Sequence, residues 1–79
     1  MLDRILDAFP DEEFLKADGF DEAVIGATSD LRLVYSVPKC ERILMAQGLD
    51  EDEAADFFAF NVEGVYVGPK TPVWCYDEF

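Results

Sequence analysis

The sequence predicts a small α+β domain, in which an antiparallel sheet of about three strands carries two to four helices on one face. Two kinds of spacing support this class: apolar residues recur at helical intervals near the start and in the middle of the chain, and they alternate at residues 31–37. The expected order is helix, hairpin, two helices and strand, which suits helices packed on an antiparallel sheet. We expect residues 1–79 to form a single domain, because 79 residues leave no room for a second.

The N-terminal part is expected to form two short helices. Apolar side chains follow helical spacing over residues 2–8, and Pro10 ends that pattern. Acidic residues 11–13 favour a second helix start, because carboxylates are stabilised by the positive end of the helix dipole. The pair Asp18-Gly19 would then stop this second helix.

Two strands joined by a tight turn are expected next. Residues 22–28 form the weaker candidate, because Gly26 interrupts them. Residues 31–37 form the stronger one, in which one face is expected to carry Leu31, Leu33, Tyr35 and Val37. The short link at Ser29-Asp30 has turn chemistry, so the two strands should pair as an antiparallel hairpin.

Two consecutive helices and a closing strand complete the expected fold. Pro38 fits the first turn of a helix that Gly48 would end. Asp50 and Glu53 have the spacing of a capping box at the start of the next helix. Its apolar stripe is expected to comprise Ala54, Phe57, Phe58, Asn61, Val62 and Val65, with Gly64 near its end. Residues 71–76 should form the last strand, with Trp74 and Tyr76 sharing one face.

Composition and charge narrow the classes of partner. Hydrophobic residues make up 51% of the chain, which favours a packed core over disorder. The net charge of -12 argues against direct binding to nucleic acid or to an anionic membrane, because both carry negative charge. Neither a secretory h-region nor an apolar run of membrane-spanning length is evident in the sequence. A basic protein surface is therefore the expected partner.

The residue types argue against catalysis and against a bound metal or cofactor. The sequence has no histidine, so the commonest general base and any serine–histidine or cysteine–histidine pair are missing. The acidic run that begins at Asp50 lacks the glycine and the final glutamate of a calcium-binding EF-hand loop. Cys40 and Cys75 are expected to be free thiols in a reducing compartment, with a disulfide between them as the alternative. We therefore expect a protein that is not an enzyme and needs no cofactor.

The acidic residues are the main candidate binding site. Residues 1–30 hold nine acids and two bases, and residues 50–79 hold eight acids and one base, so each segment has a net charge of -7. If the fold brings the two segments together, carboxylates one helical turn apart could occupy a groove built for phosphates. The candidate partner-binding residues are Glu12, Glu13, Asp50, Glu51, Asp52, Glu53 and Asp56. The alternative is that these acids cap helices and solvate the surface, while an exposed aromatic side chain such as Phe60, Trp74 or Tyr76 anchors the partner.

The stretch from Asp21 to Trp74 resembles a family of small phage-encoded proteins. The resemblance lies in residues 21–26, in Lys39-Cys40, in residues 53–62 and 64–68, and in residues 71–74, and its most specific part runs from Phe58 to Trp74. In size and acidity the chain is also similar to anti-CRISPR proteins, including those that act on type I Cascade complexes. That second similarity is one of type and not of motif. Neither resemblance assigns a role to any single residue.

The similarity in type to anti-CRISPR proteins, together with the resemblance to phage proteins, implies a phage inhibitor that acts in the host cytoplasm. Such a protein would bind the positively charged nucleic-acid-binding surface of a host defence complex, such as Cascade, and block DNA binding by acidic mimicry. The alternative is a phage accessory protein that binds its partner through an exposed aromatic surface, with the charge serving solubility only. A monomer is favoured in either case.

Overall fold

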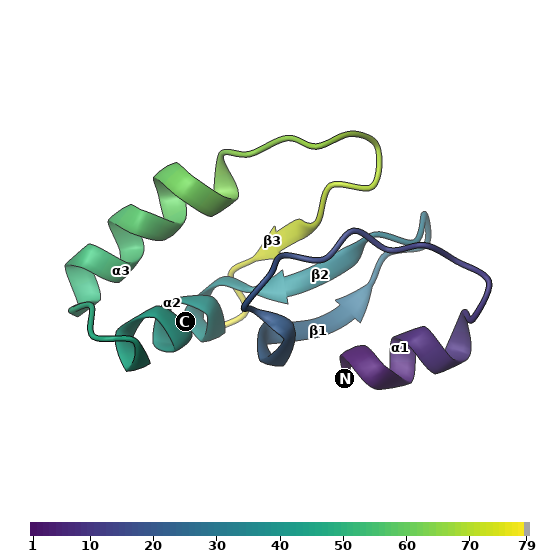
Figure 1. Cartoon of the computed structure of the whole chain (residues 1–79), viewed down its shortest axis with the longest axis horizontal. Helices are drawn as coiled ribbons and strands as arrows, with labels where there is room; N and C mark the ends of the chain where they lie inside the picture. Colours follow the sequence, from purple (N-terminus) through teal and green to yellow (C-terminus); the bar gives the residue numbers. More distant parts are fainter. Residues whose placement is uncertain (79) are drawn as a thin grey trace.

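The computed structural model describes residues 1–78. In it, three helices accompany a three-stranded sheet (Figure 1). The helices are α1 (Leu2–Ala8), α2 (Val37–Ala46) and α3 (Glu51–Phe58). The strands are β1 (Val24–Ala27), β2 (Leu33–Ser36) and β3 (Val73–Cys75). A 3₁₀ turn, η1 (Asp21–Ala23), precedes β1, and a π-helical turn, η2 (Ala59–Glu63), continues from α3. The predicted α+β class is thus confirmed.

Strands β1 and β2 form the expected antiparallel hairpin. Val24 pairs with Tyr35 and Ala27 with Leu33, and the register shifts next to Gly26, where the sequence pattern was weakest. Hydrogen bonds within residues 28–32 close the turn: the Thr28 N–H donates to the Arg32 carbonyl, and the Leu31 N–H donates to the Thr28 carbonyl. Leu31 has a φ of 62°, a left-handed backbone conformation uncommon outside glycine.

Strand β3 pairs parallel to β2, so the sheet is mixed and not antiparallel throughout. Tyr35 lies opposite Trp74, and Ser36 lies opposite Cys75. The reason is the connection: residues 37–72 contain α2, α3 and a long loop, and a crossover of this length can return the chain in the same direction. The expectation of three strands is right, whereas the expected direction of the last one is wrong.

The helix expected after Pro10 does not form. Residues 9–20 run as an irregular connection from α1 to η1 (Figure 1). The backbone N–H of Ala17 donates to the Tyr35 hydroxyl at 2.8 Å instead of to a helical carbonyl, and Phe9 packs edge-on against Phe14. Tertiary contacts therefore replace the local preference that the acidic residues 11–13 suggested.

Helix α2 begins and ends as the sequence predicts, and α3 begins as predicted but ends at Phe58, where the π-helical turn η2 takes over up to Glu63. The Ser36 hydroxyl caps α2 by accepting from the Lys39 N–H, with Pro38 in the first turn. Gly48 follows the end of α2 with a φ of 111°, the left-handed conformation that a glycine cap adopts. Asp50 and Glu53 make both hydrogen bonds of the capping box. These local signals place α3 directly after α2.

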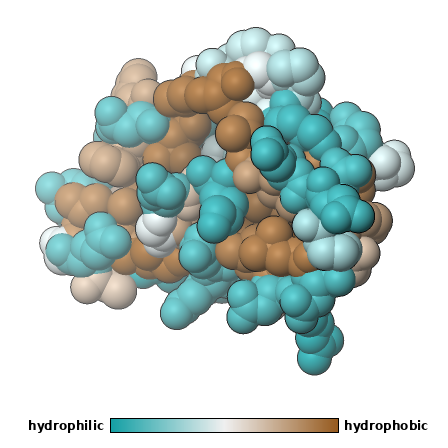
Figure 2. Space-filling model, turned by 45° about the vertical axis from the view of Figure 1, so that its right-hand side comes forward, coloured by the Kyte–Doolittle hydropathy of each residue, from teal (hydrophilic) through white to brown (hydrophobic). Residues whose placement is uncertain are grey.

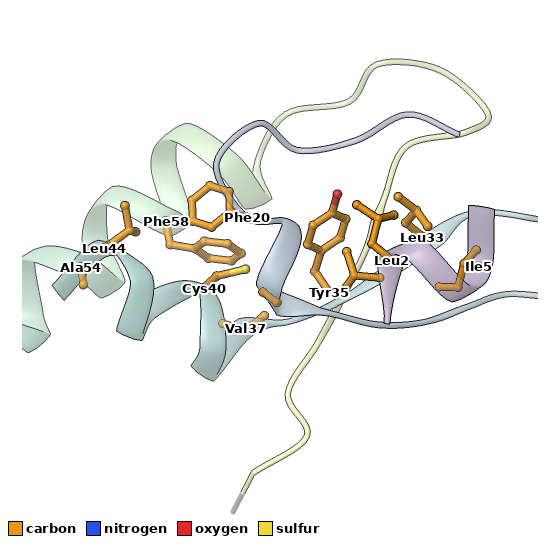
Figure 3. Packing of buried hydrophobic residues seen from close by; sticks show 12 residues of the cluster. Leu2, Ile5, Phe20, Leu33, Tyr35, Val37, Cys40, Leu44, Ala54 and Phe58 are labelled. Carbon is orange, nitrogen blue, oxygen red and sulfur yellow. The ribbon is translucent and has the colours of Figure 1, made fainter. Parts of the chain in front are cut away.

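The core lies along the length of the sheet and includes side chains from all three helices (Figure 3). At one end Phe20 packs edge-on against Phe58, near Cys40 and Leu44 of α2. Tyr35 lies in the middle, and the side chains at the other end are Leu2, Ile5 and Leu33. Within residues 1–78 we find no helix with the length and apolar character needed to cross a bilayer.

Candidate functional site

Five acidic residues at or within α3 are exposed, and two of them cap the start of the helix. The five are Asp50, Glu51, Asp52, Glu53 and Asp56. The Asp50 carboxylate accepts from the Glu53 N–H at 2.8 Å, and the Glu53 carboxylate accepts from the Asp50 N–H at 3.0 Å. Glu51 lines a shallow hollow beside Arg42 and Glu78. Asp52 and Asp56 are in no ion pair within residues 1–78. These two residues, named here the acidic pair, are the carboxylates most available to a partner.

Helical geometry turns the acidic pair away from the core. Ala54 and Phe58 are buried, so the side of α3 that faces the core is fixed by them. Asp52 and Asp56 are four residues apart, which puts their Cβ atoms about 5–6 Å from each other on the solvent side. Phe60, in the first turn of η2, follows Asp56 by four residues and is 82% exposed. The solvent side of this segment therefore presents two carboxylates followed by an aromatic ring.

Glu12 and Glu13 do not join this group. They lie in the connection after α1, whose first part lies toward the opposite end of the long axis from the start of α3 (Figure 1). The Glu12 carboxylate is 3.9 Å from the Lys70 ammonium group, which also donates to the Leu31 carbonyl. The candidate site required the two acidic segments to converge on one face, and they do not. The short α2–α3 link carries the acids of α3 to one end, while the hairpin turn and Lys70 hold Glu12 at the other.

The aromatic residues divide between core and surface. Trp74 packs against Tyr35 at 5.1 Å and against Phe58 at 5.2 Å between ring centroids. Phe57 is 44% exposed, so its expected place in the core stripe is wrong. Tyr76 follows β3, is exposed, and donates its hydroxyl hydrogen to Glu63. Of the two neighbours Phe57 and Phe58, only Phe58 is buried in the core. Successive residues of a helix point in different directions, so Phe57 is turned toward solvent.

A second exposed surface includes Phe60, which the sequence offered as a possible anchor, and three residues that the sequence did not indicate as anchors. Residues 60–67, named here the apolar segment, expose Phe60, Val65, Tyr66 and Val67. Tyr66 is 77% exposed. The π-helical turn starts this segment, with the Asn61 amide donating to the Phe57 carbonyl, and such turns are frequent at functional sites. The available signal was the run of apolar residues after Gly64, where the helical pattern ends.

Hydrogen bonds hold the far end of the apolar segment. The Val67 N–H donates to the Thr71 hydroxyl, which donates in turn to the Gly68 carbonyl at 2.6 Å. Gly68 has a φ of 114°, so the chain can reverse here toward β3. The Arg32 side chain donates to the Thr71 carbonyl at 2.7 Å and ties this turn to the hairpin. The exposed apolar side chains are thus carried by a loop fixed at both ends.

The polar groups in the core have structural roles. The buried Ser36 hydroxyl donates to the Asp77 carboxylate at 2.6 Å while it caps α2, so its contacts are those of a helix cap. Burial raises the pKa of the Cys40 thiol to about 12, which keeps it protonated and unreactive. Cys40 is buried and Cys75 is half-buried, and both are free cysteines in the structure. No group of three metal-ligating side chains occurs in the part of the chain described above.

The chain matches no family among the protein-family models, none of the curated proteins and none of the solved structures compared with it. The candidate binding sites are the two exposed surfaces, the acidic pair of α3 and the apolar segment that follows it.

Proposed function

We propose that the protein binds a basic, nucleic-acid-binding surface of another protein and blocks access of nucleic acid to it. The observation that carries this proposal is the acidic pair, Asp52 and Asp56, which lies free on the solvent side of α3. Two carboxylates one helical turn apart suit Lys and Arg side chains that otherwise contact phosphates. The exposed Phe60 ring next to them can stack on an Arg guanidinium.

The net charge supports the same type of partner. A charge of -12 gives a long-range attraction for a cationic surface and speeds association at low salt. Because the acids at the two ends are separate, the contact is centred on α3, and Glu12 and Glu13 contribute only to the overall field. The resemblance to small phage proteins makes a host defence complex such as a type I Cascade the first target to test.

The experiment is a competition for DNA. A purified type I Cascade complex is mixed with a fluorescent target duplex, and the protein is titrated in while bound duplex is followed by anisotropy. The double variant Asp52→Lys and Asp56→Lys should weaken inhibition at least tenfold, since it replaces attraction by repulsion. Binding should also weaken steeply between low and high ionic strength, because salt screens exposed charges.

The control keeps the charge change and moves its position. Asp3 and Asp7 are also exposed and one turn apart, on α1, so Asp3→Lys with Asp7→Lys alters the net charge equally. This control should weaken inhibition much less than the α3 variant does. Equal loss in both variants would mean that only total charge matters, and the assignment of the contact to α3 would be wrong. If no complex forms, the same pair of variants is applied to proteins captured from a host lysate.

A second candidate function is favoured by the exposure of Phe60 and Tyr66. A protein-binding module could use these rings as anchors, with charge serving solubility only. Under this alternative, binding is insensitive to salt and survives charge reversal on α3, but is lost in Phe60→Ser and Tyr66→Ser variants. The salt titration thus separates the two functions.

A further inference from the structure

A groove lies beside the apolar segment. It has a volume of about 360 Å³ and is bordered by three parts of the chain that are distant in sequence: residues 15–20, the apolar segment and residues 72–74. Val62, Val65 and Trp74 are among its apolar lining residues, and Lys16 and Asp18 are among its polar ones. Its volume is at the lower end of the range for small-molecule pockets, which suits one bulky side chain better than a cofactor.

The rim of the groove is itself apolar and exposed. Leu15, Val65 and Val67 line it and each also faces solvent, and Tyr66 stands between the last two. Figure 2 shows one face of the molecule, on which hydrophobic residues reach the surface between hydrophilic ones. Contiguous exposed apolar groups of this kind mark sites where another protein binds.

Trp74 lines the groove with atoms other than its indole nitrogen. Its indole N–H is buried and has no acceptor within residues 1–78. An occupant of the groove therefore does not meet this donor, and the groove offers it mainly apolar contact.

Charge decides between the possible occupants. A second copy of the chain would bring a net charge of -12 against the same charge, which opposes self-association. Lys16 and Asp18 both line the groove, so the charges of its lining offset each other, and the attraction for a basic segment comes from the net charge of the molecule. A segment that carries a bulky apolar residue between Lys or Arg residues matches both the lining and the surrounding field.

We propose that this groove binds a bulky apolar side chain of a basic segment in the partner protein. The proposal rests on the proposed function only in that the partner is a basic protein, and it assigns the anchor to a surface distinct from the acidic pair. Charge brings the partner to the protein, and the groove fixes its register. A partner contact at the groove does not require that nucleic acid be displaced.

The test uses three short peptides and the whole chain labelled with nitrogen-15. Acetyl-Lys-Lys-Trp-Lys-Lys-amide should shift the amide signals of Val62 and Val65 and the indole signal of Trp74. Acetyl-Lys-Lys-Ser-Lys-Lys-amide keeps the charge without the anchor, and acetyl-Glu-Glu-Trp-Glu-Glu-amide keeps the anchor with the wrong charge. Both should bind at least tenfold more weakly at the groove. Shifts confined to α3, or equal shifts with the serine peptide, would overturn the proposal.

Substituted proteins test whether the tryptophan peptide contacts the groove, and this test does not need the natural partner. Val65→Ser removes apolar area at the rim and should weaken the tryptophan peptide about tenfold. Met45→Ser removes a similarly exposed apolar side chain from α2, away from the groove lining, and should leave binding unchanged. The Asp52→Lys and Asp56→Lys variant should retain the Trp74 shift at saturating peptide. Loss of that shift there, or equal loss in both serine variants, would show that the groove is not the anchor site.

Discussion

At the scale of single residues, a series of edge-on and tilted aromatic contacts joins the sheet to the helices. Tyr35 from β2 meets Trp74 from β3, which meets Phe58 from α3, which meets Phe20. Each contact joins parts of the chain that are distant in sequence, so none follows from local spacing. The periodic pattern identified Phe58 as apolar and helical, but it could not choose between Phe58 and its neighbour Phe57.

Replacing each of these neighbours by leucine tests that assignment. Phe58 is 1% exposed, so Phe58→Leu leaves an unfilled space in the core and should lower the free energy of unfolding by about 1–3 kcal/mol. Phe57→Leu should change it by less than about 0.5 kcal/mol, because Phe57 is half in solvent. Urea denaturation followed by circular dichroism measures both. Equal losses would contradict the burial of Phe58 alone.

The Cys40 thiol gives a pH-dependent contribution to stability. Its pKa in the folded state is raised by burial, and next by the charge of Glu41, from 9.0 to about 12. Between these values the unfolded chain releases the proton while the folded chain keeps it, so the unfolded state binds fewer protons. The contribution of the thiol is complete below pH 9 and declines as pH rises toward 12.

The comparison with Cys40→Ala isolates this effect from the other groups that titrate at high pH. The stability difference between wild type and variant, measured by urea denaturation, should shift against the wild type by on the order of 1–2 kcal/mol between pH 8 and pH 10.5. A difference that stays constant over this interval would mean that the thiol ionises alike in both states.

At the scale of secondary-structure elements, the sequence predicted those helix limits and strands that depend on neighbouring residues. Pro38 and Gly48 marked the limits of α2, the Asp50–Glu53 capping box marked the start of α3, and residue alternation identified β2. The helix expected at residues 11–18 failed because the Ala17 N–H bonds to Tyr35, eighteen residues away in the chain. The direction of β3 depends on how a long crossover folds back, which no spacing in the strand itself records.

The hydrogen bonds of the capping box are expected to contribute more to stability than the carboxylate charge does. Asp50→Ala removes the acceptor for the Glu53 N–H at the start of α3 and should destabilise the protein by about 1 kcal/mol. Asp56→Ala removes one carboxylate from the same helix without touching a cap, and alanine favours the helix. It should leave stability unchanged or raise it slightly. Thermal unfolding of both variants checks the difference, and the order of stabilities should not reverse.

At the scale of the whole molecule, the charge is spread and not gathered. The extents of the molecule are 38 × 23 × 23 Å, and the first part of the connection after α1 lies toward the opposite end of the long axis from the start of α3 (Figure 1). The total of -12 was available from the sequence, whereas its distribution depends on tertiary structure. Three of the six basic residues are engaged within the molecule: Arg32 and Lys70 donate to backbone carbonyls, and Arg42 pairs with Glu78. Most of the acids therefore repel one another without compensation.

Salt should consequently stabilise the fold. The screening length is about 30 Å at 0.01 M salt, comparable with the molecule, and falls below about 10 Å above 0.1 M. Repulsion across the whole chain is thus present at low salt and largely removed at 0.5 M sodium chloride. The melting temperature should rise by several degrees between these conditions, since about 1 kcal/mol shifts a domain of this size by roughly 4–8 °C. The Asp3→Lys and Asp7→Lys variant has less charge to screen and should show a smaller rise. An equal rise in both proteins would assign the effect to general salting-out, and a fall in melting temperature would mean that attractive pairs outweigh the repulsion.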